Sequence, residues 1–92
     1  MRLKVEFTTE PFALDGFPEH AKAARRAMDL AGLAVDVGPF GTSAEGSATD
    51  ALAAITRLLQ DSLASGATRI SLQVSTLGED GLPIADREED SQ

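Results

Sequence analysis

The chain has 92 residues, of which 42% are hydrophobic and 25% are charged, as is ordinary for one small globular domain. It contains no cysteine, which excludes disulfide bonds and thiolate chemistry. No apolar run approaches the roughly 20 residues that a membrane helix needs. We therefore expect a cytoplasmic protein with no membrane partner.

The net charge of −7 is unevenly distributed along the chain. Residues 1–78 hold nine acids and seven bases, net −2, whereas residues 79–92 hold six acids and one base, net −5. Because the body carries no basic stripe, nucleic acid is not expected as a partner. We expect one domain over residues 1–77 and an acidic, disordered tail over residues 78–92, where no periodicity is found.

The first half of the chain predicts a strand, a helix and a second strand. Residues 2–8 alternate, with an inward set of Leu3, Val5 and Phe7. Pro18 suits the first turn of a helix, and His20 in that turn is expected to be solvated. Gly32 is a natural helix stop before a strand over 33–37. The buried helix face is expected to hold Ala21, Ala24, Ala27, Met28 and Ala31.

The second half repeats this order after the glycine-containing stretch Gly38–Gly46. Ser47 or Thr49 can cap a helix that Gly66 closes, and its expected apolar stripe is Leu52, Ile55, Leu58, Leu59 and Leu63. The last strand is expected over residues 68–76, with an inward set of Ile70, Leu72 and Val74.

These elements predict an α+β fold, a ferredoxin-like βαββαβ sandwich with two helices on one face of a four-stranded antiparallel sheet. The other face is expected to be bare and polar, with occupants that include Lys4, Glu6, Thr8, Ser71, Gln73 and Ser75. Because the apolar core is thin, we expect the protein to self-associate as a homodimer or homotetramer.

Catalytic machinery is not evident in the sequence. His20 is the single histidine, no serine lies in a recognisable nucleophile elbow, and no histidine pair has metal spacing. The glycines near Thr42 lack the lysine of a phosphate-binding loop and do not fit the dinucleotide fingerprint. We therefore expect a protein that is not an enzyme, with no catalytic residue, metal ligand or cofactor.

A binding site is expected instead around the predicted hairpin strand that contains Thr42 and Glu45. Glutamate is not favoured in a glycine-flanked strand, so Glu45 is as good a candidate for function as for structure. If this strand lies beside the first, acids and hydroxyls converge on a cationic ligand, and a phenyl ring can stack on a heteroaromatic cation. The candidate ligand-binding residues are Glu6, Thr8, Glu10, Phe40, Thr42 and Glu45.

Three segments carry a resemblance to a known family: VEFTTEPF at 5–12, GPFGTSAEG at 38–46 and GATRISLQV at 66–74. Together they resemble the thiamine-binding protein family of the YkoF-like superfamily, over residues 1–76. The resemblance implies a ferredoxin-like oligomer that binds thiamine or its hydroxymethylpyrimidine moiety without catalysis, in vitamin uptake or salvage. Thr42 and Glu45 match the central motif, and Glu6 and Glu10 match the acids of the first strand.

A second class of function is also compatible with the sequence. The bare, polar sheet face can serve a regulatory or structural homo-oligomer that contacts itself or a protein partner. The two hypotheses differ in whether a pocket lies near Thr42. A third reading, an enzyme, lacks a general base paired with a nucleophile.

Overall fold

The computed structural model describes residues 1–13, 16–38, 41–82 and 84. Three elements occur in each half, and the order strand, helix, strand is repeated. The elements are β1 (Arg2–Glu10), α1 (Glu19–Leu30), β2 (Ala34–Val37), β3 (Thr42–Ser47), α2 (Ala48–Ala64) and β4 (Arg69–Leu77).

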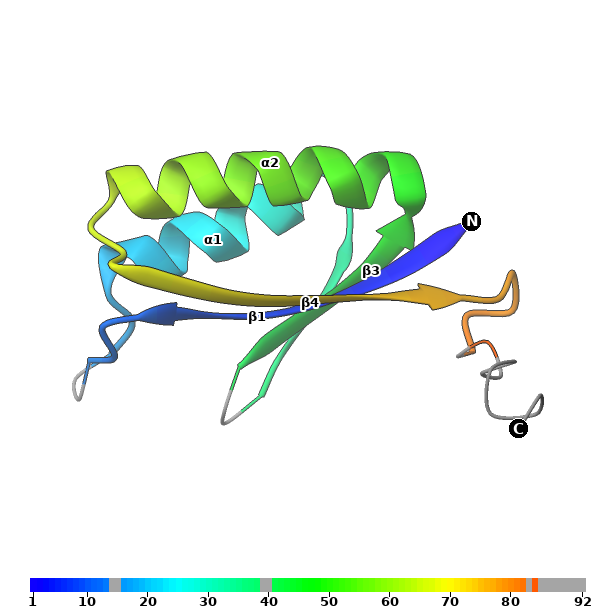
Figure 1. Ribbon diagram of the computed structural model, residues 1–92, viewed down its shortest axis with the longest axis horizontal. Helices are drawn as coiled ribbons and strands as arrows, with labels where there is room; N and C mark the ends of the chain where they lie inside the picture. Colours follow the sequence, from blue (N-terminus) through cyan, green and yellow to red (C-terminus); the bar gives the residue numbers. More distant parts are fainter. Residues whose placement is uncertain (14–15, 39–40, 83, 85–92) are drawn as a thin grey trace, which may run out of the picture.

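The four strands form one antiparallel sheet in the order β2-β3-β1-β4, and both helices lie on the same side of it (Figure 1). The predicted ferredoxin-like sandwich is therefore confirmed. β1 runs two residues further than predicted, because Thr9 and Glu10 still pair with β4 before Pro11 ends the strand.

Alternation along β1 separates the core from the open face of the sheet. Leu3, Val5 and Phe7 turn toward the helices and are at most 6% exposed. The side chains packed on them from the helices are mainly alanines, together with Met28 and Leu58. Small side chains at these positions let both helices lie close to the sheet.

The core face of α1 agrees with the predicted helical spacing at most positions. Ala24, Ala27 and Met28 are buried as predicted. Ala23 is also buried, while Ala21 and Ala31 are only half-buried. The buried stripe is thus rotated slightly from the predicted one.

The apolar stripe predicted for the second helix is wrong at three positions. Leu58 is fully buried and Ile55 is half-buried, but Leu52, Leu59 and Leu63 are 57%, 37% and 55% exposed. The buried positions of α2 are Ala51, Ala54, Leu58 and Ser62. A pattern that favours leucine over alanine fails here because close contact between helix and sheet requires the smaller side chain.

The helix ends follow the predicted local chemistry. The Ser47 hydroxyl accepts a hydrogen bond from the Asp50 backbone N–H at 3.1 Å, so Ser47 is the N-cap of α2. Gly32 and Gly66, with φ of 80° and 107°, follow the C-terminal ends of α1 and α2.

The other face of the sheet is uncovered within the described residues, as Figure 1 shows. Register places Glu45, Lys4 and Ser75 in one row across β3, β1 and β4. Ser43, Glu6 and Gln73 form the next row, which Asp36 of β2 extends. The predicted polar face is thus confirmed.

The predicted disordered tail lies largely outside the described residues, since positions 83 and 85–92 are not among them. In the described part, the Gly78 N–H donates to the Leu82 carbonyl at 2.7 Å. Disorder of the tail stays a prediction.

Gly46→Ala is expected to destabilise the fold. A Cβ at residue 46 would collide with Cδ2 of Leu33, a side chain that is itself only 6% exposed. Overpacking of this kind costs about 1–3 kcal/mol in the free energy of unfolding, which chemical denaturation measures. Ser43→Ala, on the open face of the same strand, is the control and is expected to be nearly neutral. Equal stability of the two variants would contradict the prediction.

Candidate functional site

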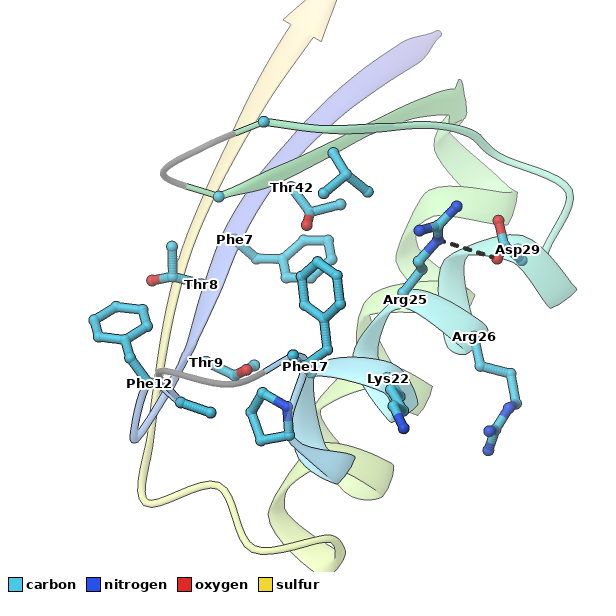
Figure 2. Close-up of a pocket in the computed structure, with 17 residues that line it drawn as sticks. Phe7, Thr8, Thr9, Phe12, Phe17, Lys22, Arg25, Arg26, Asp29 and Thr42 are labelled. Carbon is cyan, nitrogen blue, oxygen red and sulfur yellow. Dashed lines mark ion pairs between the residues drawn. The ribbon is translucent and has the colours of Figure 1, made fainter.

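A hollow among the described residues lies on the helix side of the sheet, and we call it the helix-side cavity. Its volume is about 710 Å³, within the range of small-molecule sites. Four segments surround it: the end of β1, the strand-to-helix connection, the exposed side of α1 and the β2–β3 hairpin (Figure 2). Its lining residues include Phe7, Thr8, Thr9, Phe12, Phe17, Lys22, Arg25, Arg26, Asp29, Val37 and Thr42.

The hairpin wall depends on a close approach of its backbone to β1. The Gly38 N–H donates to the Gly41 carbonyl at 2.8 Å and closes the hairpin. A Cβ at Gly41 would lie 3.1 Å from Cγ2 of Thr8 and 3.2 Å from the carbonyl oxygen of Phe7. Glycine therefore permits the hairpin to lie against the end of β1.

His20 of α1 forms hydrogen bonds to the end of β1 and to the segment that follows it. Its Nε2 lies 2.9 Å from the Pro11 carbonyl oxygen, which can only accept, so Nε2 carries a proton. Its Nδ1 lies 2.8 Å from the Thr9 hydroxyl, which donates to it when the ring is neutral. The prediction of a solvated His20 is wrong, because the side chain is only 3% exposed and bonds to Thr9, which lines the cavity.

Aromatic side chains dominate the apolar part of the cavity. Phe7 is 6% exposed and belongs to the core, whereas Phe12 and Phe17 are 73% and 62% exposed. Figure 2 shows Phe12 and Phe17 rising from the two ends of the connection. Two large exposed aromatic rings beside a cavity are typical of a surface that a ligand covers.

The charged side chains of the described lining are mostly basic. Lys22, Arg25 and Arg26 all come from α1, and Asp29 is the one acid in the described lining. Arg25 Nε lies 3.7 Å from Asp29 Oδ2, and both side chains are more than half exposed. Such a pair is weak, so Arg25 keeps most of its capacity to bind another anion.

A second, shallower hollow lies on the open face of the sheet, and we call it the sheet-face groove. Its volume is about 690 Å³, and it shares Phe7, Thr8, Gly38, Gly41 and Thr42 with the helix-side cavity. Its other lining residues are Glu6, Asp36, Ser43, Ser71, Leu72 and Gln73. The charged residues of the groove are the acids Glu6 and Asp36, whereas those of the cavity are mostly bases. Gly38, Gly41 and Thr42 of the β2–β3 hairpin border both hollows.

The six predicted ligand-binding residues are only partly brought together. Thr8 and Thr42 line both hollows, and Glu6 lines the groove. Glu10 and Glu45 line neither hollow. Oε2 of Glu10 lies 3.9 Å from Nε of Arg69, and Glu45 is the partner of Lys4 in the pairing of β3 with β1. Phe40 lies outside the described residues. A ligand-binding role for each of the six stays a prediction.

Phe17, Lys22 and Arg25 line the helix-side cavity but are not among the site residues predicted from the sequence. Lys22 and Arg25 lie away from the alanine stripe of α1, and helical periodicity by itself attaches no function to such positions. The clustering of Phe7, Phe12 and Phe17, three of the four aromatic residues, was the available signal. No pattern in the helix alone indicates that the hairpin lies across from it.

Two kinds of feature are absent from the part of the chain that the structure describes. No group of three or more His, Cys, Asp or Glu side chains there is arranged to hold a metal ion. No helix there is both long and apolar enough to cross a bilayer.

Comparison with known proteins shows the fold. No family model matches the chain, and no curated protein matches it. Among solved structures, it is similar to a Thermotoga maritima protein that carries a provisional assignment to thiamine biosynthesis or salvage. The TM-score is 0.62 at 24% identity, and the match covers 99% of this chain and 97% of the other.

Two further solved structures have the same fold. A domain of unknown function, DUF77, from Bacillus cereus has a TM-score of 0.62 at 18% identity, over 96% of this chain and 86% of that one. A Streptococcus pneumoniae protein has a TM-score of 0.65 at 15% identity, over the whole of both chains. These likenesses show a shared α+β architecture.

Thr9→Val is expected to destabilise the protein. The substitution keeps the shape of the side chain but leaves Nδ1 of the buried His20 without its partner, at a cost of about 1–3 kcal/mol. Thr8→Val, one residue away and half-buried, is the matched control and is expected to change stability little. Urea denaturation of the two variants measures the difference, and equal values would show that the Thr9–His20 bond contributes nothing.

Proposed function

We propose that the protein binds thiamine or its hydroxymethylpyrimidine moiety without catalysis, and that it serves vitamin uptake or salvage as a member of the thiamine-binding family. The observation that carries the proposal is the helix-side cavity, where two exposed phenyl rings stand beside threonine hydroxyls. A pyrimidine ring is flat and heteroaromatic, so it can stack on Phe12 or Phe17. Its amino and ring nitrogen atoms can exchange hydrogen bonds with Thr8 or Thr42.

Two further observations support this proposal. The Thermotoga maritima protein of the same fold has its provisional assignment to thiamine biosynthesis or salvage. In addition, the single histidine of this chain uses both ring nitrogens in contacts within the fold. A histidine held in this way is poorly placed to act as a general base on a bound ligand, which favours binding over catalysis.

Phe17→Ala is expected to weaken binding of thiamine and of hydroxymethylpyrimidine by roughly ten-fold, since loss of one stacked ring costs about 1–3 kcal/mol. Isothermal titration calorimetry on the full chain measures the affinities. Leu63→Ala removes a comparably exposed apolar side chain from α2, outside the lining, and is expected to leave binding unchanged. Absence of binding by the unaltered protein at millimolar ligand would reject the proposal.

Glu45→Gln tests in the same titration whether the ligand extends over the open face of the sheet to the motif residue Glu45, which lies on that face and lines neither hollow. If the motif residue Glu45 binds ligand, as the family resemblance implies, this variant loses affinity and the ligand lies toward the sheet face. If the ligand lies in the helix-side cavity, the variant binds as the unaltered protein does.

We also propose that the protein is a homo-oligomer, and a specific feature of β4 favours this. β4 is a nine-residue strand at the edge of the sheet, and its pairing with β1 runs without a bulge. Residues 70–77 contain no charge and no proline, the devices that usually protect an edge strand. Val74 is 46% exposed at the middle of this edge. Pairing of β4 from two copies of the protein would cover Val74 and the unpaired backbone groups at this edge.

Val74→Lys is expected to convert the oligomer to a monomer, because a charge at the edge opposes strand pairing. Multi-angle light scattering over a range of concentrations measures the mass. Leu63→Lys, at a comparably exposed apolar position on α2, is expected to remain oligomeric. Dissociation by Leu63→Lys alone would assign the interface to α2, and a monomeric unaltered protein would reject self-association.

A further inference from the structure

The basic side chains of α1 are concentrated at the helix-side cavity. Lys22, Arg25 and Arg26 lie within five consecutive residues, and all three are among its lining residues. Figure 2 shows Arg25 projecting from α1 toward the strands of the hairpin, with its guanidinium group beside Asp29, while Lys22 projects from the same helix in another direction. In contrast, α2 carries Arg57 as its single base and presents leucines to solvent.

The nearby acids leave most of this positive charge available. Arg25 Nε is 3.7 Å from Asp29, and Lys22 Nζ is 3.6 Å from Glu19 Oε1. These separations exceed a good charge-assisted hydrogen bond, which is about 2.7–2.9 Å. Arg26 takes part in none of the ion pairs found among the described residues.

The positive charge of these α1 bases disfavours a ligand whose only charge is positive. A thiazolium ring placed beside Lys22 and Arg25 would be repelled, because like charges at short range destabilise each other. Glu6 and Asp36, whose carboxylates can attract a cation, line the sheet-face groove instead. A ligand of the helix-side cavity therefore gains most when it carries an anionic group next to its aromatic ring.

The shape and charge of the whole chain limit the kind of anion. The cavity accommodates a small molecule, and the chain has a net charge of −7. A long polyanion such as nucleic acid would contact much of this negative surface and would be repelled. A phosphate monoester concentrates its negative charge at one end of a small molecule, where a single base such as Arg25 can bind it.

We propose that the helix-side cavity binds a phosphate monoester of a small heteroaromatic molecule. The aromatic ring stacks on Phe17, Arg25 donates to the phosphate from its guanidinium group, and Lys22 adds a second positive charge. Thr42 lines the same cavity, and its hydroxyl can donate a further hydrogen bond to the phosphate. The proposal rests on the proposed binding function and adds that the phosphorylated form is the preferred ligand.

The test compares three probes by isothermal titration on the full chain: thiamine, thiamine monophosphate and phenyl phosphate. Thiamine monophosphate is expected to bind at least about ten-fold more tightly than thiamine, since a charge-assisted hydrogen bond is stronger than a neutral one. This preference is expected to fall as salt is added, because the contacts are partly exposed.

Arg25→Gln is expected to remove most of the preference for thiamine monophosphate over thiamine, because the guanidinium group that would donate to the phosphate is lost. Arg57→Gln is the matched control, because Arg57 also forms an i,i+4 pair with an aspartate, Asp61, at 3.0 Å, but lies on α2 outside the cavity. It is expected to bind all probes as the unaltered protein does. Amide chemical shifts of residues 41–42 and 17–25 locate the bound probe by NMR.

The possible outcomes distinguish the preference for a phosphate monoester from the proposed vitamin binding. Tight thiamine binding with no gain from the phosphate would overturn this inference and leave the proposed function standing. Binding of phenyl phosphate that depends on Arg25, with no binding of thiamine or its monophosphate, would support the anionic site and reject the vitamin ligand. Equal losses in Arg25→Gln and Arg57→Gln, or no binding of any phosphate probe, would also overturn it.

Discussion

Pairing of β1 with strands on both sides is the interaction on which the rest of the structure depends. β1 lies between β3 and β4, and its alternate residues face opposite sides of the sheet. Phe7 and Thr9 therefore contribute to the helix side, while Glu6 turns to the open face. A shift of one residue in this register would exchange the two sets and destroy both the core and the cavity.

The second requirement is that the segment between β1 and α1 is held at a defined place. His20 makes this connection with two hydrogen bonds, one to the end of β1 and one to the backbone of Pro11. The contact with Thr9 is buried and the contact with Pro11 is partly buried, so loss of the Thr9 hydroxyl leaves a buried ring nitrogen unpaired. The exposed ring of Phe12 follows directly after Pro11, and its position beside the cavity depends on this anchor.

The sheet and its hairpin also separate charges of opposite sign. Bases from α1 line the cavity on one side, and Glu6 and Asp36 line the groove on the other. Thr42 borders both hollows, at the end of the strand where they meet. A ligand with a charged group is therefore directed to one side by its sign, and the small size of the hollows favours a small molecule over a polymer.

The sequence by itself determined the elements, the order in which they occur and the polar character of the open face. Alternation in β1, glycine stops at Gly32 and Gly66 and the Ser47 cap are local signals, and each acts within a few residues of chain. The tertiary structure alone decided which side chains share a cavity. His20 looks like a solvated helix residue in the sequence, and Leu52 and Leu63 look like core, but His20 is buried and both leucines are exposed. Their environments are set by the helix rotation and by elements distant in the chain, which no local periodicity records.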